Sequence, residues 1–446
     1  MELSRETVLE KKGLLEKLFK LSENKTDVKT EVIAGITTFM TMAYILVVNP
    51  LILGDAGMDK GAVFVATAVS AAVATLVMAL YANYPFVLAP GMGLNAFFAY
   101  TVVKTMGYSW QFALTAVFIE GIIFILLTFL NVREKIIDCI PETLKNAVTA
   151  GIGMYIAFIG MANAGIVKQG GAILEIGNLR DPLVVLTIAG LILTGVLLVR
   201  NVKGALLVGM LITSVAGMVL GLVALPKGIV SVPPSLAPIF GAFLQPDKAQ
   251  IFSFQMLVIV FTFLFVDLFD TIGCLVGLSA KAGMLDENGK LPRAKQALFA
   301  DAIGTTFGAV LGTSTVTTYI ESAAGVAEGG RTGLTALVSG ILFLVSIFFA
   351  PLFTAIPTQA TAPILILVGV MMATAMLKID FNDMTEAIPA FLTIVMMPLA
   401  YSIAEGLVFG IVSYAGIKLF SGKGKTVTTA LYVLAVLFVV KIVLAG

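Results

Sequence analysis

The sequence predicts an all-α polytopic membrane protein of about 14 transmembrane segments, arranged as two inverted repeats of seven segments each. Short strands and half-helices are expected in segments 3 and 10. Three observations support this prediction: the composition, the recurrence of apolar segments, and the distribution of lysine and arginine between them. Of the 446 residues 59% are hydrophobic and 12% are charged, and the mean hydropathy is +1.03. These values lie far outside the range of soluble proteins.

The first 31 residues form a charged segment without the pattern of a cleavable signal. It holds seven basic and seven acidic residues, with leucine and phenylalanine at roughly helical spacing. Such a pattern predicts an amphipathic helix on the cytoplasmic surface of the membrane.

Apolar segments follow to the end of the chain, in two sets of seven separated by a proline-rich connector at 225–251. The first set lies at about 32–50, 61–82, 86–103, 111–130, 143–162, 182–199 and 204–224. The second set lies at about 252–279, 297–311, 313–326, 332–350, 360–377, 387–402 and 403–421. A last apolar helix, at 426–446, is either an extra span or a helix on the membrane surface.

The basic residues indicate the orientation of the chain. With the N-terminus in the cytoplasm, 21 lysine and arginine residues fall in cytoplasmic segments and six in external ones, as the positive-inside rule requires. Because seven is odd, two consecutive sets of seven must enter the membrane from opposite sides. The second set is therefore an inverted copy of the first.

Charge and rare residues exclude several classes of function. The net charge of +1 gives no field that would attract nucleic acid. The two cysteines indicate neither a disulfide framework nor a zinc site. Histidine is absent, so any proton carrier must be a carboxylate.

Segment 10 holds an acid in an unusual setting. β-Branched residues stand at 313, 315, 316, 317 and 318, followed by Glu321 and a short run of helix formers, which predicts a strand that leads into half a helix. An acid at membrane depth is costly unless it has a function, so Glu321 is a candidate ligand-binding residue. The alternative is that Glu321 lies at the membrane edge and the threonines only bond neighbouring helices.

Segment 3 is interrupted in the corresponding position of the first repeat, by Pro90, Gly91 and Gly93. Paired interrupted segments in the two halves of a transporter are the best sequence indication of its substrate site. Asn95 and Glu321 are then expected near two facing half-helix N-termini, where backbone N–H groups can donate to a ligand. The glycines also fit a dinucleotide-binding fingerprint, which we discount because the βαβ context and the following acid are missing.

Segment 8 contains two acids, Asp267 and Asp270, three residues apart and hence on one face of a helix. Two like charges in a medium of low dielectric favour a shared proton, so the pair are candidate proton carriers. The alternative is a polar pair with a structural role only. Two other acids, Glu120 and Glu405, have no partnered motif and are weaker candidates.

Aromatic residues lie next to these polar groups in the sequence: Phe97, Phe98, Phe269 and Tyr319. They could stack on a flat ligand, although a phenylalanine in a membrane span is by default core or lipid contact. Carboxylate acceptors, an amide and aromatic faces together suit a heterocycle with N–H donors and ring acceptors. A nucleobase fits this description better than an inorganic anion, which the acids would repel.

Four motifs resemble the adenine/guanine/hypoxanthine permeases, the azaguanine-type branch of the nucleobase–cation symporters. They are Thr-Thr-Tyr-Ile-Glu-Ser-Ala-Ala-Gly at 317–325, Asp-Leu-Phe-Asp-Thr-Ile-Gly at 267–273, Gly-Met-Gly-Leu-Asn-Ala-Phe at 91–97, and the opening motif at 26–45. The resemblance covers about residues 25–420. It implies the uracil-permease fold, with a substrate-binding core domain (32–130 and 252–350) and a gate domain (143–224 and 360–421).

The resemblance also implies roles for individual residues. Glu321, Asp270 or Asp267, and Asn95 would bind the base. Their neighbours in the sequence are further candidates for contact with it: Phe97, Phe269, Tyr319 and Ser322. Asp267, Asp270 and Glu321 would couple transport to H⁺, with Na⁺ as the alternative ion and no cofactor. The uracil-type branch has a histidine where this chain has Cys274, which shifts the proton route to the aspartates and favours a purine over a pyrimidine.

The function that we expect is a permease of the cytoplasmic membrane that takes up purine nucleobases by proton symport, and not an enzyme. Membrane lipid and a purine are its expected partners, nucleic acid is not, and both monomer and homodimer stay open. An anion exchanger of the same fold is the main alternative, and a channel is a weaker one. An intramembrane aspartyl protease is disfavoured, because the Gly-x-Gly-Asp signature is missing and the two aspartates are too close in sequence.

Overall fold

A computed structural model describes residues 13–130, 141–171, 174–226, 228–246, 248–286 and 291–445. Within these residues nine helices are long and apolar enough to cross a membrane, and shorter apolar helices accompany them. Two small two-stranded sheets are the β-structure of this part of the chain. The predicted class, an all-α membrane protein with short strands, is confirmed.

The first repeat consists of seven consecutive segments, several of them made of two or three elements. Its segments are α3 (Val28–Met42) with α4 (Ile45–Asp55), α5 (Lys60–Val77) with η1 (Met78–Ala82), β1 (Leu88–Pro90) with α6 (Met92–Ala96) and η2 (Phe97–Thr105), α7 (Trp110–Phe129), α9 (Glu142–Asn163), α10 (Pro182–Val199) and α11 (Ala205–Val219). A hairpin of β2 (Val167–Gln169) and β3 (Leu174–Ile176) joins α9 to α10.

The second repeat follows the same order, again with its strand in the third segment. Its segments are α13 (Phe254–Ala282), α14 (Ala294–Leu311), β4 (Val316–Thr318) with η4 (Ile320–Ser322) and α15 (Ala323–Ala327), α16 (Gly333–Ser346) with η5 (Ile347–Phe349) and α17 (Ala350–Thr354), α18 (Thr358–Ala373) with η6 (Thr374–Lys378), α19 (Met384–Leu399) and α20 (Ile403–Phe420). The connector between the repeats contains η3 (Ala242–Leu244) and α12 (Lys248–Ile251).

Polar residues determine where many of these helices begin. Each accepts a hydrogen bond from the first turn of its helix and so satisfies a backbone N–H that has no intrahelical partner. Those with such a bond are Asp27, Asp59, Ser109, Asp181, Ser253, Thr332, Asp383 and Ser402. The helix starts are therefore encoded locally.

The two interrupted segments meet at the centre of the fold, where β1 and β4 pair antiparallel with Ala89 opposite Thr317. One threonine from the preceding helix supports each strand. Thr75 of α5 bonds both the N–H and the C=O of Leu88, and Thr305 of α14 does the same for Val316. In each repeat, then, a threonine of the second segment bonds the strand of the third segment, as an inverted repeat requires.

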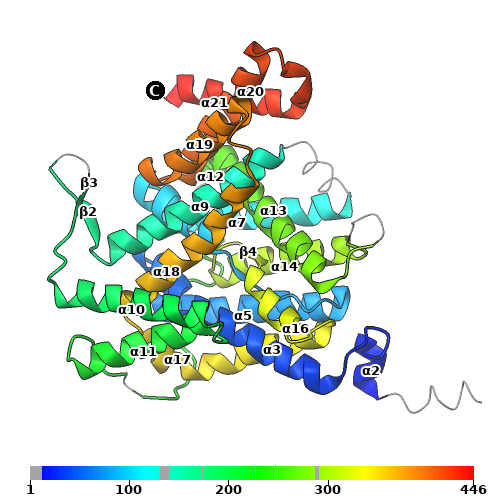
Figure 1. Cartoon of the computed structure of the whole chain (residues 1–446), viewed down its shortest axis with the longest axis vertical. Helices are drawn as coiled ribbons and strands as arrows, with labels where there is room; N and C mark the ends of the chain where they lie inside the picture. Colours follow the sequence, from blue (N-terminus) through cyan, green and yellow to red (C-terminus); the bar gives the residue numbers. More distant parts are fainter. Residues whose placement is uncertain are drawn as a thin grey trace, which may run out of the picture.

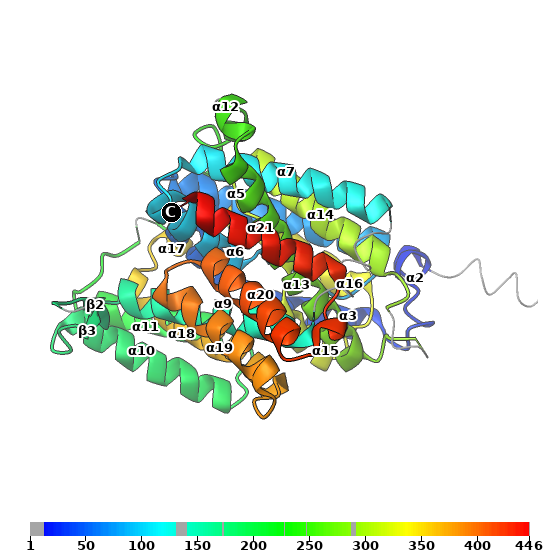
Figure 2. The same cartoon turned by 90° about the horizontal axis from the view of Figure 1, so that it is seen from above.

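The helices sort into two packing sets. One set consists of α3, α5, α7, α13, α14 and α16, which pack against one another and against β1, β4, α4, α6, η2 and α15. The other set consists of α9, α10, α11, α18, α19 and α20. Figures 1 and 2 show α2 (Leu14–Phe19) and the β2–β3 hairpin at opposite ends of the molecule in both views. The last helix, α21 (Thr429–Ala445), turns back beside α20 through η7 (Gly424–Thr426).

The N-terminal segment differs from the expected surface helix over residues 1–31. Residues 1–12 lie outside the described residues, α2 is six residues long, and the next helix begins at Val28. Glu31 is buried, and its carboxylate accepts hydrogen bonds from backbone N–H groups of Arg331, Thr332 and Thr335. A carboxylate that receives several donors can be buried at low cost, so Glu31 joins α3 to the start of α16.

Candidate functional site

Glu321 lies on η4, directly after β4. Its Oε1 accepts a hydrogen bond of 2.6 Å from the hydroxyl of Tyr44, and its backbone carbonyl accepts one of 3.5 Å from the hydroxyl of Thr41. Tyr44 stands where segment 1 is interrupted, between the end of α3 and the start of α4. The break in segment 1 thus faces the break in segment 10, and a tyrosine orients the predicted acid.

Asp270 lies on α13 next to this pair. Its carboxylate is close enough to Glu321, Asp301 and Thr317 of β4 to interact with all three. Cys274, one helical turn further on, experiences the charges of the same three acids. Asp270, Glu321 and Asp301 are therefore close enough to interact electrostatically.

Asp267 is fully buried, and Thr271 connects it with Asp301 of α14. The Thr271 hydroxyl oxygen is 2.7 Å from Oδ1 of Asp301 and 3.1 Å from Oδ1 of Asp267. A hydroxyl has one proton and can donate to only one of two carboxylates. A proton on one of the two acids would let that acid donate to Thr271 while Thr271 donates to the other.

Asn95 is fully buried on α6. Its Oδ1 accepts a hydrogen bond from the hydroxyl of Ser314, in the stretch that precedes β4. Its Nδ2 is buried and has no hydrogen-bond partner among the described residues. Because an unpaired buried donor costs about 1–3 kcal/mol, this amide is a candidate to donate to a ligand.

The other predicted site residues mainly hold segments 3 and 10 together. The hydroxyl of Tyr319 donates to the backbone carbonyl of Pro90, and Oγ of Ser322 accepts a bond of 3.0 Å from the backbone N–H of Val87. Phe97 is fully buried, edge-on against Phe263, with 4.8 Å between ring centroids. The side chain of Phe269 lies outside the described residues.

Glu120 is buried on α7 and accepts a hydrogen bond of 2.7 Å from the hydroxyl of Thr315. It thus pairs inside the helix bundle with the stretch that leads into β4. Among the described residues no group of three or more His, Cys, Asp or Glu side chains could hold a metal ion.

Two residues of the site are absent from the sequence-based predictions. Asp301 could have been found by the same rule that identified Asp267, because it too is an acid within an apolar segment. Tyr44 gave a weaker signal, since a tyrosine in an apolar span is common. Its partner is 277 residues away in the sequence, and only the fold shows that the two side chains meet.

The glycines of segment 3 serve close packing, which explains the dinucleotide-like fingerprint. A Cβ at Gly91 would come within 2.9 Å of the side chain of Thr317, and a Cβ at Gly93 within 2.6 Å of Cγ2 of Ile152. Real Cβ atoms essentially never approach neighbouring atoms closer than 3.0 Å. Gly93 therefore lets α6 approach α9, a helix of the other packing set.

The model of the Permease family matches residues 29–409. The chain is 46% identical to an adenine permease of Escherichia coli strain K12, covering 97% of this chain and 96% of that protein. It is 47% identical to a guanine/hypoxanthine permease of Bacillus subtilis strain 168, covering 94% of this chain and 98% of that protein.

The fold is similar to that of the transmembrane domain of a cyanobacterial bicarbonate transporter. The TM-score is 0.65 with 17% sequence identity, and the match covers 86% of this chain and 97% of that domain. At this identity the likeness concerns the fold and not the substrate.

Proposed function

The chain belongs to the permease family, and we propose on that premise that it takes up purine nucleobases in symport with a cation. The family membership makes it a membrane transporter. The substrate class, the coupling ion and the transport cycle are our proposal. Its relatives named above are permeases for adenine and for guanine and hypoxanthine.

The observation that carries the substrate assignment is the arrangement of donor and acceptors around the β1–β4 crossing. Asn95 offers a buried amide donor on α6, and Glu321 and Asp270 offer carboxylate acceptors from segments 10 and 8. A purine presents N–H donors and ring-nitrogen acceptors along its edges, which complements this set. An inorganic anion would be repelled by these two carboxylates and would find one donor, the amide of Asn95.

The pair of acids joined by Thr271 supports a proton as the coupling ion. The contacts of Thr271 with Asp267 and Asp301 are satisfied together when one of the acids carries a proton. In this proposal the proton enters with the base at Asp267, Asp270 and Glu321, and Asp301 shares it. Na⁺ is the alternative ion.

Alternating access would follow from movement of one packing set against the other. We assign the set that carries β1 and β4 to the core domain and the set of α9–α11 and α18–α20 to the gate domain. The sorting of helix contacts into these sets supports the assignment. The distribution of basic residues supports a cytoplasmic N-terminus in the cytoplasmic membrane.

The test is uptake of radiolabelled adenine, guanine, hypoxanthine and uracil into proteoliposomes, with and without an imposed pH gradient. We expect saturable purine uptake that requires the gradient. Glu321→Gln should reduce uptake by about 10- to 100-fold, because a charge-assisted hydrogen bond is worth roughly 1.5–3 kcal/mol. Glu142→Gln, at an exposed glutamate, is the matched control and should transport normally.

Normal uptake by the Glu321→Gln variant would reject the assignment of Glu321. If the wild type carries no base but exchanges bicarbonate, the anion exchanger is the correct function. Flux that does not saturate with substrate concentration would indicate a channel.

A further inference from the structure

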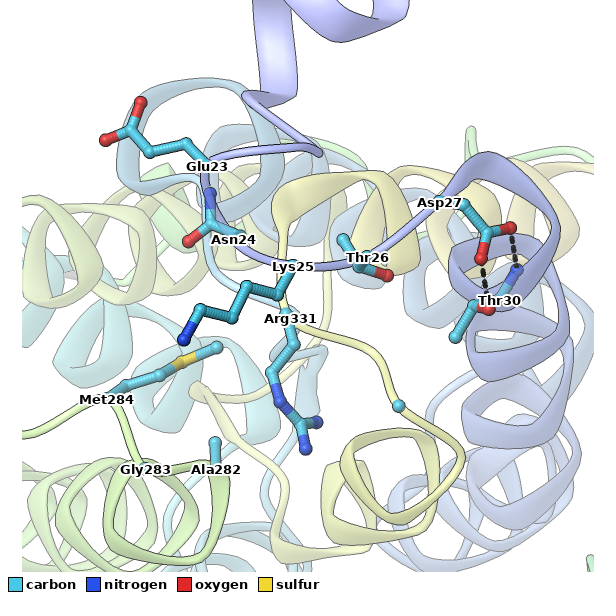
Figure 3. Close-up of a pocket in the computed structure, with 11 residues that line it drawn as sticks. Glu23, Asn24, Lys25, Thr26, Asp27, Thr30, Ala282, Gly283, Met284 and Arg331 are labelled. Carbon is cyan, nitrogen blue, oxygen red and sulfur yellow. Dashed lines mark hydrogen bonds between the residues drawn. The ribbon is translucent and has the colours of Figure 1, made fainter.

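A cavity of about 470 Å³ opens on the end of the molecule where the N-terminal segment lies (Figure 3). The residues around it come from the N-terminal segment, from the end of α13, and from the turn between α15 and α16. They are Glu23, Asn24, Lys25, Thr26, Asp27, Thr30, Ala282, Gly283, Met284, Gly329 and Arg331. The cavity shares no lining residue with the proposed purine site.

The two acids at the cavity are engaged elsewhere. Asp27 caps α3: it accepts hydrogen bonds from the backbone N–H groups of Lys29 and Thr30 and from the Thr30 hydroxyl. Chiefly the bonds from Thr30 lower the pKa of Asp27 below its usual value. Glu23 pairs with Lys20 at 3.4 Å and points away from the basic residues in Figure 3.

The two basic residues, in contrast, have unused donors. Nη1 of Arg331 donates to the backbone carbonyls of Val326 and Gly330, each at 2.7 Å. In the described part of the chain neither Nη2 and Nε of Arg331 nor Nζ of Lys25 has a hydrogen-bond or ion-pair partner. Figure 3 shows the Lys25 side chain extended toward Met284 and the Arg331 side chain extended below Lys25, away from Glu23.

We propose that this cavity binds a phosphate-bearing anion, either a soluble phosphomonoester or the phosphodiester headgroup of a lipid. A guanidinium edge and an ammonium group are the donors that phosphate oxygens prefer. The cavity is far larger than the roughly 30 Å³ that a water molecule occupies, and lies within the range of about 300–1,000 Å³ of small-molecule sites. It therefore has room for a phosphate together with the group to which it is esterified.

Binding at this cavity acts on segment 10. Arg331 bonds the carbonyl of Val326 in α15, the half-helix that follows Glu321, and the carbonyl of Gly330 in the turn after it. An anion that draws the guanidinium of Arg331 into the cavity competes with these two carbonyls for it. The site is therefore placed to change the position of α15 from outside the purine site.

The test measures binding to the full-length protein, so that its result does not depend on transport. Isothermal titration calorimetry in a neutral detergent, with adenosine monophosphate and inorganic phosphate as probes, covers a soluble ligand. Thermal unfolding in phosphatidylcholine nanodiscs, with and without phosphatidylglycerol, covers a lipid headgroup. Saturable binding of a soluble probe, or stabilisation by phosphatidylglycerol, identifies the source of the phosphate.

Lys25→Gln is the test variant, because Lys25 is exposed and its ammonium group has no partner among the residues that the structure describes. We expect binding, or the stabilisation by lipid, to weaken by about 5- to 10-fold, the effect of one charge-assisted contact. Lys29→Gln, at another exposed lysine that does not line the cavity, should bind as the wild type does. Arg331→Lys, which keeps the charge but loses the planar fork, should bind more weakly than the wild type.

The proposal is overturned if neither soluble probe binds and phosphatidylglycerol has no effect. It is equally overturned if Lys25→Gln and Lys29→Gln behave alike. Either result leaves the proposed purine transport untouched, since that proposal is tested by uptake and by Glu321.

Discussion

At the scale of single residues, the acids inside the helix bundle differ in their hydrogen-bond partners. Asp267 and Asp301 meet at one threonine hydroxyl, whereas Glu321 receives a tyrosine hydroxyl. Glu31 receives backbone N–H groups. Several donors satisfy the oxygens of Glu31, whereas the single hydroxyl between Asp267 and Asp301 can donate to only one of them.

Replacement of Thr271 tests the role of this shared hydroxyl. Thr271→Val removes the hydroxyl that contacts both Asp267 and Asp301. We expect the dependence of purine uptake on external pH to change. Uptake at the optimal pH should fall about tenfold, because leaving a buried carboxylate without its hydrogen-bond donor costs roughly 1–3 kcal/mol. The separate variant Thr271→Ser keeps the hydroxyl and should have the pH profile of the wild type.

Thr262→Val is the matched control for this test. Thr262 lies on the same helix and is also buried, but its hydroxyl donates only to the backbone carbonyl of Val258. An unchanged pH profile in Thr271→Val would show that the two acids titrate independently of the bridge.

At the scale of elements, the crossing of segments 3 and 10 depends on hydrogen bonds from the side chains around it. β1 and β4 are three residues each, too short to be stable by themselves. They are held by Thr75 and Thr305, by the bond between Tyr319 and Pro90, and by that between Val87 and Ser322. The backbone polar groups that the interrupted helices leave free are thereby satisfied, as the interior of a membrane protein requires.

Gly93→Ala tests the close approach of α6 to α9. The added Cβ would meet Cγ2 of Ile152 at 2.6 Å, and overpacking of this kind costs on the order of 1–3 kcal/mol. Because Gly93 and Ile152 belong to different packing sets, we expect the maximal rate of uptake to fall while the protein still elutes as a single folded species in size-exclusion chromatography. Ile152→Ala in the same chain should recover much of the rate.

Gly416→Ala on α20 is the control, because a Cβ there meets nothing within 4 Å. If Gly93→Ala transports as well as Gly416→Ala, the contact between the two helices does not limit the transport cycle.

At the scale of the whole molecule, polar contacts connect the two packing sets, among them an ion pair and a chain of hydrogen bonds. At the turn before α11, Lys203 forms an ion pair of 2.7 Å with Glu328 at the end of α15. Elsewhere Nδ2 of Asn163 donates to the hydroxyl of Tyr100, which in turn donates to Asp55. If the two sets move relative to each other during transport, such contacts must form and break in each cycle.

Charge reversal tests the first of these connections. Both residues are partly exposed, with side-chain exposure of 58% for Lys203 and 24% for Glu328, and exposed ion pairs are worth roughly 0–1 kcal/mol. Lys203→Glu should therefore change the rate of uptake by no more than about fivefold, with a smaller effect at high salt. The double variant Lys203→Glu/Glu328→Lys should return toward the wild-type rate, and failure of this rescue would show that the pair is not coupled to transport.

The sequence by itself determined the membrane class, the two sets of seven segments, their inversion and the two interrupted segments. Each of these features is local: a helix satisfies its own backbone, so apolar length, capping residues and flanking charges suffice to locate it. The same local reasoning identified Glu321, Asp270 and Asn95, because a polar group at membrane depth is conspicuous in its own segment.

Only the tertiary structure decided which of these groups meet. Asp301 and Thr271 lie 30 residues apart, and Tyr44 and Glu321 lie 277 apart, so the pattern of neither segment reveals its partner. The pairing of β1 with β4, and the use of Tyr319 and Ser322 to hold the two strands, arise in the same way. A hydrogen bond between distant segments depends on how whole helices pack, and no local periodicity records it.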